Sequence, residues 1–151
     1  MLTRSDIVAA ARRYIGTPYH HQGALAGAGC DCLGLVRGIW RDLYGAEPEQ
    51  PPVYTPDWGE VGGDEHILAA AGRHMLGRPV SEAEPGDVLV FRLRRGAIAK
   101  HIAVLSAASQ PDGSGGRIIH AQSNDQVREV VLTPWWRRHA VAAFMFPGAQ
   151  A

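Results

Sequence analysis

Apolar residues recur at helical spacing in the first half of the chain. Positions three and four apart lie on one face of a helix, which an amphipathic helix buries. Thr3, followed by Asp6 three positions later, resembles a capping box and marks a helix start. The glycine-rich stretch 16–31 predicts a loop. The pattern predicts three helices, over residues 3–15, 32–44 and 64–76.

The second half of the chain changes to short segments rich in β-branched and apolar residues, separated by turn signals. The segment 134–138 is expected to be a turn or a short helical link. Helices followed by strands indicate an α+β fold, with N-terminal helices packed on a C-terminal antiparallel sheet of about five strands. The expected strands are residues 88–94, 101–107, 117–122, 127–132 and 140–146.

Length and composition fit one globular domain over residues 1–151. The chain is 46% hydrophobic and 20% charged, which excludes wholesale disorder. Its 15 basic and 15 acidic residues give no net charge, which argues against a nucleic-acid partner. The first residues lack a clean apolar core, and no long apolar run follows. We therefore expect synthesis in the cytoplasm without a signal peptide, and no stable membrane insertion.

Cys32 is the first candidate for chemistry. It follows the glycine-rich loop and begins a predicted helix, where backbone N–H groups and the helix dipole stabilise a thiolate. His101 opens one predicted strand and His120 lies near the end of the next, so adjacent antiparallel strands can place them together. A thiol, an imidazole and an orienting group form a catalytic triad. The alternative is a buried structural cysteine with two satisfied histidines.

A zinc cluster is a further alternative, with His20, His21, Cys30 and Cys32 as ligands. A Cys-x-Cys spacing is unusual for structural zinc, and a metal on Cys32 would silence the nucleophile. We expect no metal and no cofactor. Cys30 is most simply incidental, and a redox link to Cys32 is the other interpretation.

Five short segments resemble the motifs of the NlpC/P60 cysteine peptidases, in the order typical of that family. Asp31–Val36 resembles its nucleophile motif. Upstream, Gly16–Tyr19 is similar to its G-x-P-Y segment. The family's strand motifs are matched by the segments Pro85–Phe91, His101–Leu105 and Ile119–Ala121.

This resemblance implies a papain-like α+β fold and hydrolysis of peptidoglycan stem peptides, typically between γ-D-glutamate and a diamino acid. It implies Cys32 as nucleophile, His101 as general base and acid, and His120 as the residue that orients His101. Tyr19 would line the site and help bind substrate or the oxyanion. Asp31 would support local structure or recognise the stem peptide. No metal or cofactor is implied.

Segments 44–58, 99–101 and 134–138 also resemble the cell-wall peptidase branch of tailed phages and gene transfer agents. That resemblance implies delivery by a phage-like tail tip, with tail-tip proteins as partners and the periplasmic cell wall as the place of action. Leu33 departs from the serine usual after the nucleophile, which affects the expected stem specificity. The spacer from His101 to His120 is long and predicts an extended hairpin at 107–116.

Other interpretations remain open on the sequence alone. The chain could be a structural or adaptor subunit of a tail tip with little turnover, or an amidase or acyltransferase that uses the same triad. Trp135 and Trp136 either cover one end of the sheet or bind a partner or glycan. Tyr54, Pro56 and Trp58 are expected either to pack, to form one wall of the cleft or to contact a tail protein.

Overall fold

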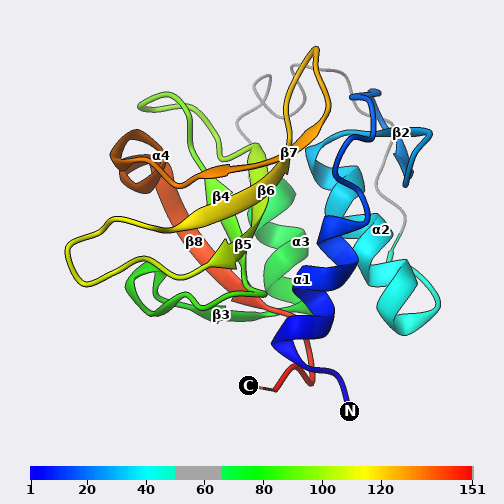
Figure 1. Ribbon diagram of the computed structural model, residues 1–151, viewed down its shortest axis with the longest axis horizontal. Coiled ribbons are helices and arrows are strands. Elements are labelled where there is room, and N and C mark those ends of the chain that lie inside the picture. Colours follow the sequence, from blue (N-terminus) through cyan, green and yellow to red (C-terminus); the bar gives the residue numbers. More distant parts are fainter. Residues whose placement is uncertain (50–65, 151) are drawn as a thin grey trace.

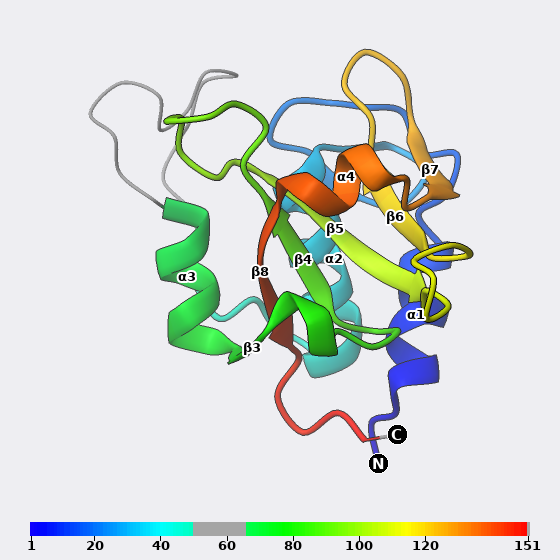
Figure 2. The ribbon, with the colours of Figure 1, turned by 90° about the vertical axis from the view of Figure 1, so that its left-hand side faces the viewer.

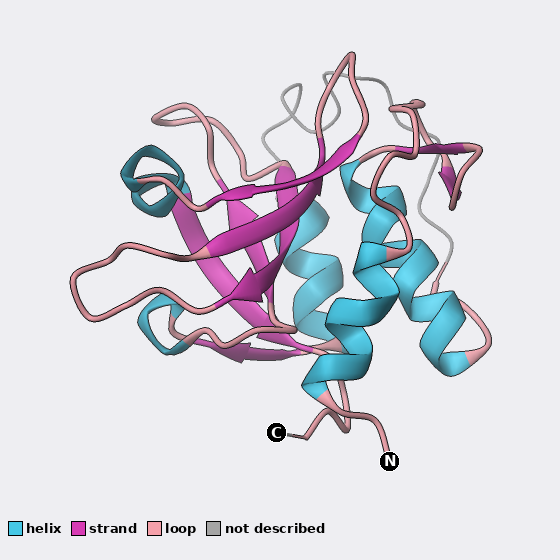
Figure 3. Cartoon of the chain, viewed as in Figure 1, coloured by secondary structure: helices cyan, strands magenta, loops and turns pink. Residues whose placement is uncertain are grey.

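The computed structural model describes residues 1–49 and 66–150. The described residues form an α+β fold (Figures 1 and 3), which confirms the predicted fold class. The helices are α1 Arg4–Arg12, α2 Cys32–Tyr44, α3 His66–His74, α4 Pro134–His139 and the short 3-10 helix η1 Val80–Glu82. The strands are β1 Ala24–Leu25, β2 Gly29–Cys30, β3 Leu76–Arg78, β4 Val88–Phe91, β5 His101–Ala107, β6 Arg117–Ala121, β7 Val127–Val131 and β8 Ala140–Met145.

A six-stranded sheet forms the centre of the fold, in the order β3-β8-β4-β5-β6-β7. Each neighbouring pair of strands in it is antiparallel. Helices α1, α2 and α3 cover one face of the sheet and α4 lies against the other (Figures 1 and 2). The long helices therefore pack together on one side of the sheet, as the sequence predicts.

The alternation of side chains along the strands builds a separate core on each face of the sheet. Val90 and Val104 belong to the larger core, which includes residues of α1, α2 and α3. Their neighbours Leu89 and Leu105 belong to the smaller core beside α4. Because side chains of a strand point to alternate faces, His101 lies on the α4 face while Ile102 lies on the face of the long helices.

The sheet has one more strand than the sequence predicts. The expected third helix ends at His74, and Leu76–Arg78 instead forms the edge strand β3 beside β8. Strand β8 lies between β3 and β4, so the sheet is not a simple meander. The predicted strand 88–94 ends at Phe91. The Arg92 backbone N–H still donates to the His139 carbonyl at 2.9 Å, and its side chain donates to the Ala97 carbonyl at 2.7 Å.

The N-terminal segments also differ from the prediction in their bounds. Helix α1 has the expected capping box at Thr3 but ends at Arg12. After it, Tyr14 and Ile15 make i→i−3 bonds that tighten the chain, and Ile15 is 43% exposed. The predicted loop 16–31 contains the two-stranded ribbon β1–β2. Among the described residues, no helix is long and apolar enough to cross a membrane.

The segment 44–58 falls mostly outside the described residues, and so do Tyr54 and Trp58. The expected hairpin between β5 and β6 is present: the two strands pair antiparallel and the chain turns over at Pro111–Gly113. It extends away from the ends of the strands that carry His101 and His120, so its length leaves the two histidines adjacent.

Candidate active site

Asp31 and Cys32 set the start of α2. Asp31 is the N-cap residue: its Oδ1 accepts from the backbone N–H of Gly34 at 2.7 Å, and its Oδ2 accepts from that of Gln22 at 2.8 Å. These bonds satisfy an otherwise unpaired helix donor and tie the preceding loop to the helix. They place Cys32 at the first helical position, as the sequence predicts.

Gly34 allows the first turn of α2 to approach the loop closely. A Cβ at this position would lie 1.6 Å from the Gly23 carbonyl oxygen and 3.0 Å from Asp31 Oδ1. The Gly23 oxygen accepts from the Asp31 amide at 3.1 Å, so the contact is part of the cap. The glycine of the Asp31–Val36 motif is therefore a steric requirement for placing the cysteine.

Two adjacent strands bring His101 and His120 together. The pairing of Val104 with Ile119 places the two histidines diagonally on one face of the sheet. The rings are nearly perpendicular at 87°, and His101 Nε2 lies 2.9 Å from His120 Nδ1. The predicted proximity of the two histidines is thus present in the structure.

One cavity contains the whole set of predicted catalytic side chains. Cys32, His101 and His120 line it together with Tyr19 and Trp136. The Cys32 thiol donates to the Lys100 carbonyl, with Sγ and O 3.6 Å apart, so the sulfur lies against the backbone next to His101. The structure therefore assembles a thiol, two imidazoles and a phenol from four separate segments.

The hydrogen bond between the histidines limits which ring nitrogen of His101 can meet a thiol. His101 Nε2 is engaged with His120, so Nδ1 is the ring nitrogen left to accept a proton from a thiol. For that, Nε2 must carry the hydrogen and donate it to His120 Nδ1. In that tautomer, His120 Nδ1 accepts the hydrogen bond, which is the geometry that the third member of a triad requires.

Burial favours the neutral forms of both the thiol and the imidazole. Burial, followed by the negative charge of Asp31, raises the pKa of Cys32 to about 12. Burial, followed by the neighbouring His120, lowers the pKa of His101 to about 3. Low dielectric surroundings disfavour each charged form. The sequence predicts a thiolate stabilised at the helix start, whereas desolvation of Cys32 favours the neutral thiol in the free protein.

Tyr19 lies in the wall of the same cavity. Its backbone N–H donates to the Asp125 carbonyl at 2.8 Å, and a bridge to Cys30 links it to β2. Burial raises the pKa of Tyr19 to about 12, so its hydroxyl stays protonated at neutral pH. It can therefore donate a hydrogen bond to a substrate or oxyanion. Both carboxylate oxygens of Asp31 accept backbone bonds, which fits the structural part of its two expected roles.

Trp136 is a residue of the site that the motifs do not identify. It lines the cavity and packs against Phe91, with ring centroids 5.0 Å apart. Trp135 is 45% exposed and stacks on His139. The two tryptophans thus differ: Trp136 belongs to the active-site wall, and Trp135 lies at the surface. The sequence signal for this difference is Thr133, the N-cap of α4. The cap fixes where the helix begins and thereby which of the two tryptophans faces the sheet.

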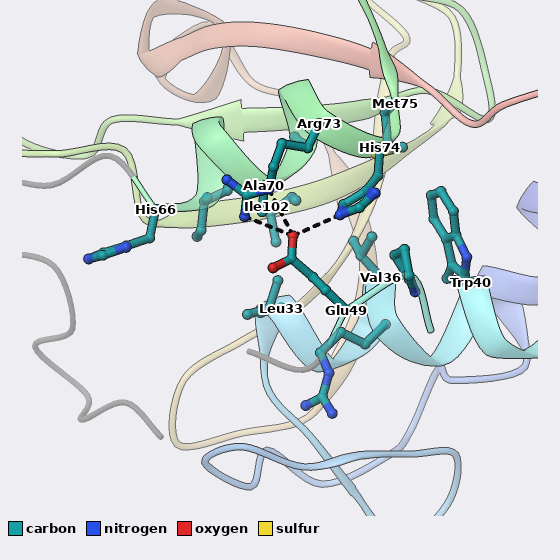
Figure 4. A pocket seen from close by; sticks show the side chains of 14 residues that line it. Leu33, Val36, Trp40, Glu49, His66, Ala70, Arg73, His74, Met75 and Ile102 are labelled. Atoms are coloured by element: carbon teal, nitrogen blue, oxygen red, sulfur yellow. Dashed lines mark hydrogen bonds and ion pairs between the residues drawn. The ribbon is translucent and has the colours of Figure 1, made fainter. Parts of the chain in front are cut away.

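A second hollow lies between α2 and α3 (Figure 4). Glu49 lies within it, accepting from Arg73 and contacting His74, each at 2.7 Å. Leu33 and Ile102 line this hollow, although each directly follows a residue of the catalytic cavity. The side chain of Leu33 therefore faces the α2–α3 hollow, and the serine that it replaces in the family pattern would face the same way.

The zinc alternative finds no support in the described part of the chain, where no three candidate ligands come together. Cys30 is fully buried and donates to the Asp31 carbonyl at 3.1 Å. His20 is exposed and its Nδ1 lies 3.0 Å from the His21 carbonyl oxygen. Cys30 and Cys32 are both free thiols.

Solved structures similar to this chain carry the same type of domain. The NlpC/P60 domain of the peptidoglycan hydrolase SagA aligns with a TM-score of 0.65 and 26% identity, covering 96% of this chain and 100% of that one. An NlpC/P60 family protein from Bacillus cereus gives a TM-score of 0.63 at 19% identity, covering 93% of this chain and 39% of that one.

A lipoprotein-like NLP/P60 family protein from Staphylococcus aureus gives a TM-score of 0.61 at 23% identity, covering 95% of this chain and 41% of that one. The last two likenesses show the fold alone. Comparison with curated protein sequences finds no significant match. The sequence profile of the NlpC/P60 family matches residues 16–145, from the loop before the nucleophile to the last strand. The chain therefore belongs to the NlpC/P60 family.

Proposed function

We propose that this chain is a cysteine endopeptidase that hydrolyses peptidoglycan stem peptides at the bond between γ-D-glutamate and a diamino acid. The observation that carries the proposal is the cavity in which Cys32, at the start of α2, lies with a hydrogen-bonded pair of histidines. Membership of the NlpC/P60 family and the likeness to the domain of a peptidoglycan hydrolase support the wall as substrate.

The chemistry follows from the positions of these groups. Cys32 Sγ attacks the carbonyl carbon of the scissile bond while its proton passes to His101 Nδ1. The tetrahedral oxyanion forms beside the start of α2, where backbone N–H groups and the Tyr19 hydroxyl can donate to it. Protonated His101 then gives its proton to the leaving amine, which leaves a thioester. Water, deprotonated by His101, attacks that thioester and releases the acid, and protonated His101 returns its proton to the departing Cys32 sulfur.

The test is digestion of purified Gram-negative sacculi, with the released fragments identified by mass spectrometry. We expect stem-peptide fragments that end at γ-D-glutamate with the unchanged protein, and none with Cys32→Ala. Cys30→Ala is the matched control: it removes the other thiol, which lies outside the cavity, and should retain cleavage. Fragments from Cys32→Ala, or cleavage at another bond, would contradict the proposed reaction.

We further propose that a phage-like tail delivers the enzyme to the periplasmic wall, with tail-tip proteins as partners. The support is the resemblance of segments 44–58, 99–101 and 134–138 to the cell-wall peptidase branch of phages and gene transfer agents. Mass spectrometry of purified particles from the producing cell should detect the chain in the tail fraction. Its absence from such particles would rule out this route.

One observation favours a second candidate, an adaptor subunit with little turnover. Burial raises the pKa of Cys32, which leaves little thiolate at neutral pH. An adaptor would release no fragments from sacculi, yet particles would need the chain in order to assemble. Full assembly with Cys32→Ala together with loss of wall cleavage would instead support the enzyme.

A further inference from the structure

Trp136 lies where the two histidines of the cavity meet α4. The short helix begins after Thr133, whose hydroxyl accepts from the Trp136 backbone N–H at 3.4 Å, and Pro134 occupies its first position. Figure 2 shows α4 crossing the sheet beside β4, β5 and β6. The Trp136 ring is packed edge-on to Phe91 of β4 at 70°. Its orientation is therefore fixed by both its own helix and the sheet.

The indole contacts both histidines in different ways. It stacks on His101 with an interplanar angle of 29° and centroids 5.3 Å apart. It meets His120 nearly perpendicularly, at 80° and 5.2 Å. The indole face thus covers His101. Because the His120 ring is nearly perpendicular to His101, it meets the same indole edge-on.

The hydrogen bond to His120 cannot orient His101 by itself. It fixes the position of Nε2, but the imidazole can still tilt about that atom. A stacked indole restricts the ring plane, and the two restraints together set the direction of Nδ1. From this geometry we infer that Trp136 is a positioning residue for catalysis, holding the His101 ring so that Nδ1 is presented to Cys32 while Nε2 stays bonded to His120.

This inference rests on the proposed thiol–imidazole chemistry and adds a residue to it. The indole also supports the charge that His101 acquires when it takes the proton. An aromatic face within about 6 Å attracts a cation through its quadrupole. The groups facing His101 come from several elements: Cys32 of α2, His120 of β6, Phe91 of β4, Trp136 of α4, and Tyr19. The π face is thus available to the imidazolium inside a largely apolar enclosure.

Two reactions test the inference with the same variants. The first is hydrolysis of a soluble tripeptide, L-Ala-γ-D-Glu-diaminopimelate. The second is alkylation of Cys32 by iodoacetamide, followed by peptide mass spectrometry, which needs no wall substrate. Trp136→Leu should lower both kcat and the alkylation rate about two- to tenfold with KM unchanged, because it removes the aromatic stack on His101. Trp136→Phe keeps a stacked face and should recover most of the loss. Trp135→Phe is the matched control: it keeps an aromatic ring beside Trp136, where the Trp135 centroid lies 5.0 Å away, and it should react like the unchanged chain.

A double-mutant cycle with His120→Gln separates positioning from a general loss of structure. Because both residues act through the His101 ring, the combined loss should be smaller than the product of the single losses. A rise in KM alone, alkylation unchanged in Trp136→Leu, no recovery in Trp136→Phe, or fully multiplicative losses would each overturn the inference. If the tripeptide is not cut by the unchanged chain but Trp136→Leu still slows alkylation, the positioning role stands and the proposed substrate fails.

Discussion

The partly buried imidazole of His101 should make the stability of the protein depend on pH. Burial lowers the pKa of His101 from 6.5 to about 3. The folded state therefore holds the imidazole neutral, while the unfolded chain takes up a proton once the pH falls below about 6.5. The contribution of His101 to stability is fully present above pH 6.5 and is lost progressively as the pH falls from 6.5 toward 3. We expect His101→Gln, which cannot titrate, to remove this loss.

The magnitude follows from the two pKa values. At pH 5 the unfolded histidine is almost fully protonated and the folded one almost fully neutral, which costs about 2 kcal/mol of stability relative to pH 8. Any folded pKa below about 4 gives the same result, because the unfolded pKa sets the size of the effect in this range. Burial also lowers the pKa of His120, but that residue stays in the variant and largely cancels in the comparison.

The assay is urea unfolding at pH 8 and pH 5, followed by circular dichroism. The free energy of unfolding of the unchanged protein should fall between these pH values by about 2 kcal/mol more than that of His101→Gln. His20→Gln is the matched control, because His20 is exposed and lies outside the cavity. The fall in its free energy of unfolding between pH 8 and pH 5 should match that of the unchanged protein within about 0.5 kcal/mol.

Two results would refute this reasoning. Equal losses in the unchanged protein and His101→Gln would mean that His101 is solvated well enough to titrate normally. A smaller loss in the unchanged protein than in the variant would mean that the folded state stabilises the imidazolium. The second result would indicate a preformed thiolate–imidazolium pair with Cys32, in place of the neutral pair that burial favours.

Three further substitutions test the framework that holds the site, each by urea unfolding. Gly34→Ala should lower the free energy of unfolding by about 3 kcal/mol, because its Cβ would lie 1.6 Å from the Gly23 oxygen. A decrease of less than about 1 kcal/mol would contradict the steric argument. Asp87→Ala should lower the free energy of unfolding by about 3–5 kcal/mol, since the buried carboxylate accepts from Arg4 Nη1 at 2.6 Å. An unchanged free energy of unfolding would show that the ion pair is dispensable. Thr3→Ala should lower the free energy of unfolding by about 1 kcal/mol, because the α1 cap is lost. An unchanged urea midpoint would show that this cap does not stabilise the protein.

The sequence predicted the parts of the site that depend on local structure. Asp31 and Gly45 define both ends of α2, the second with a φ of 87°, and these local rules place Cys32 at a helix start. His101 opens β5 at the expected residue. Neighbouring antiparallel strands then suffice to bring His120 within hydrogen-bond distance of it.

The missed features depend on tertiary contacts. The edge strand Leu76–Arg78 has three residues and no clear alternation of apolar and polar side chains. It forms by pairing with the edge of β8. The position of Trp136 over the histidines depends on how α4 crosses the sheet, which no local pattern encodes. The acidity of the thiol also depends on tertiary contacts: a helix start is visible in sequence, whereas the desolvation that raises the pKa of Cys32 is not.

In the proposed reaction, the desolvation of Cys32 and His101 controls when charge can form in the cavity. A lone thiolate or a lone imidazolium is costly in the cavity, but the two opposite charges of the tetrahedral intermediate and His101 form together and attract each other strongly in a low dielectric. Proton transfer from Cys32 should therefore accompany attack on the carbonyl instead of preceding it. His120 and Trp136 then need to hold His101 in place before the substrate arrives, because the concerted step leaves no charged pair to orient the ring beforehand. The same burial that makes the thiol a weak acid thus makes the orientation of its base a condition of catalysis.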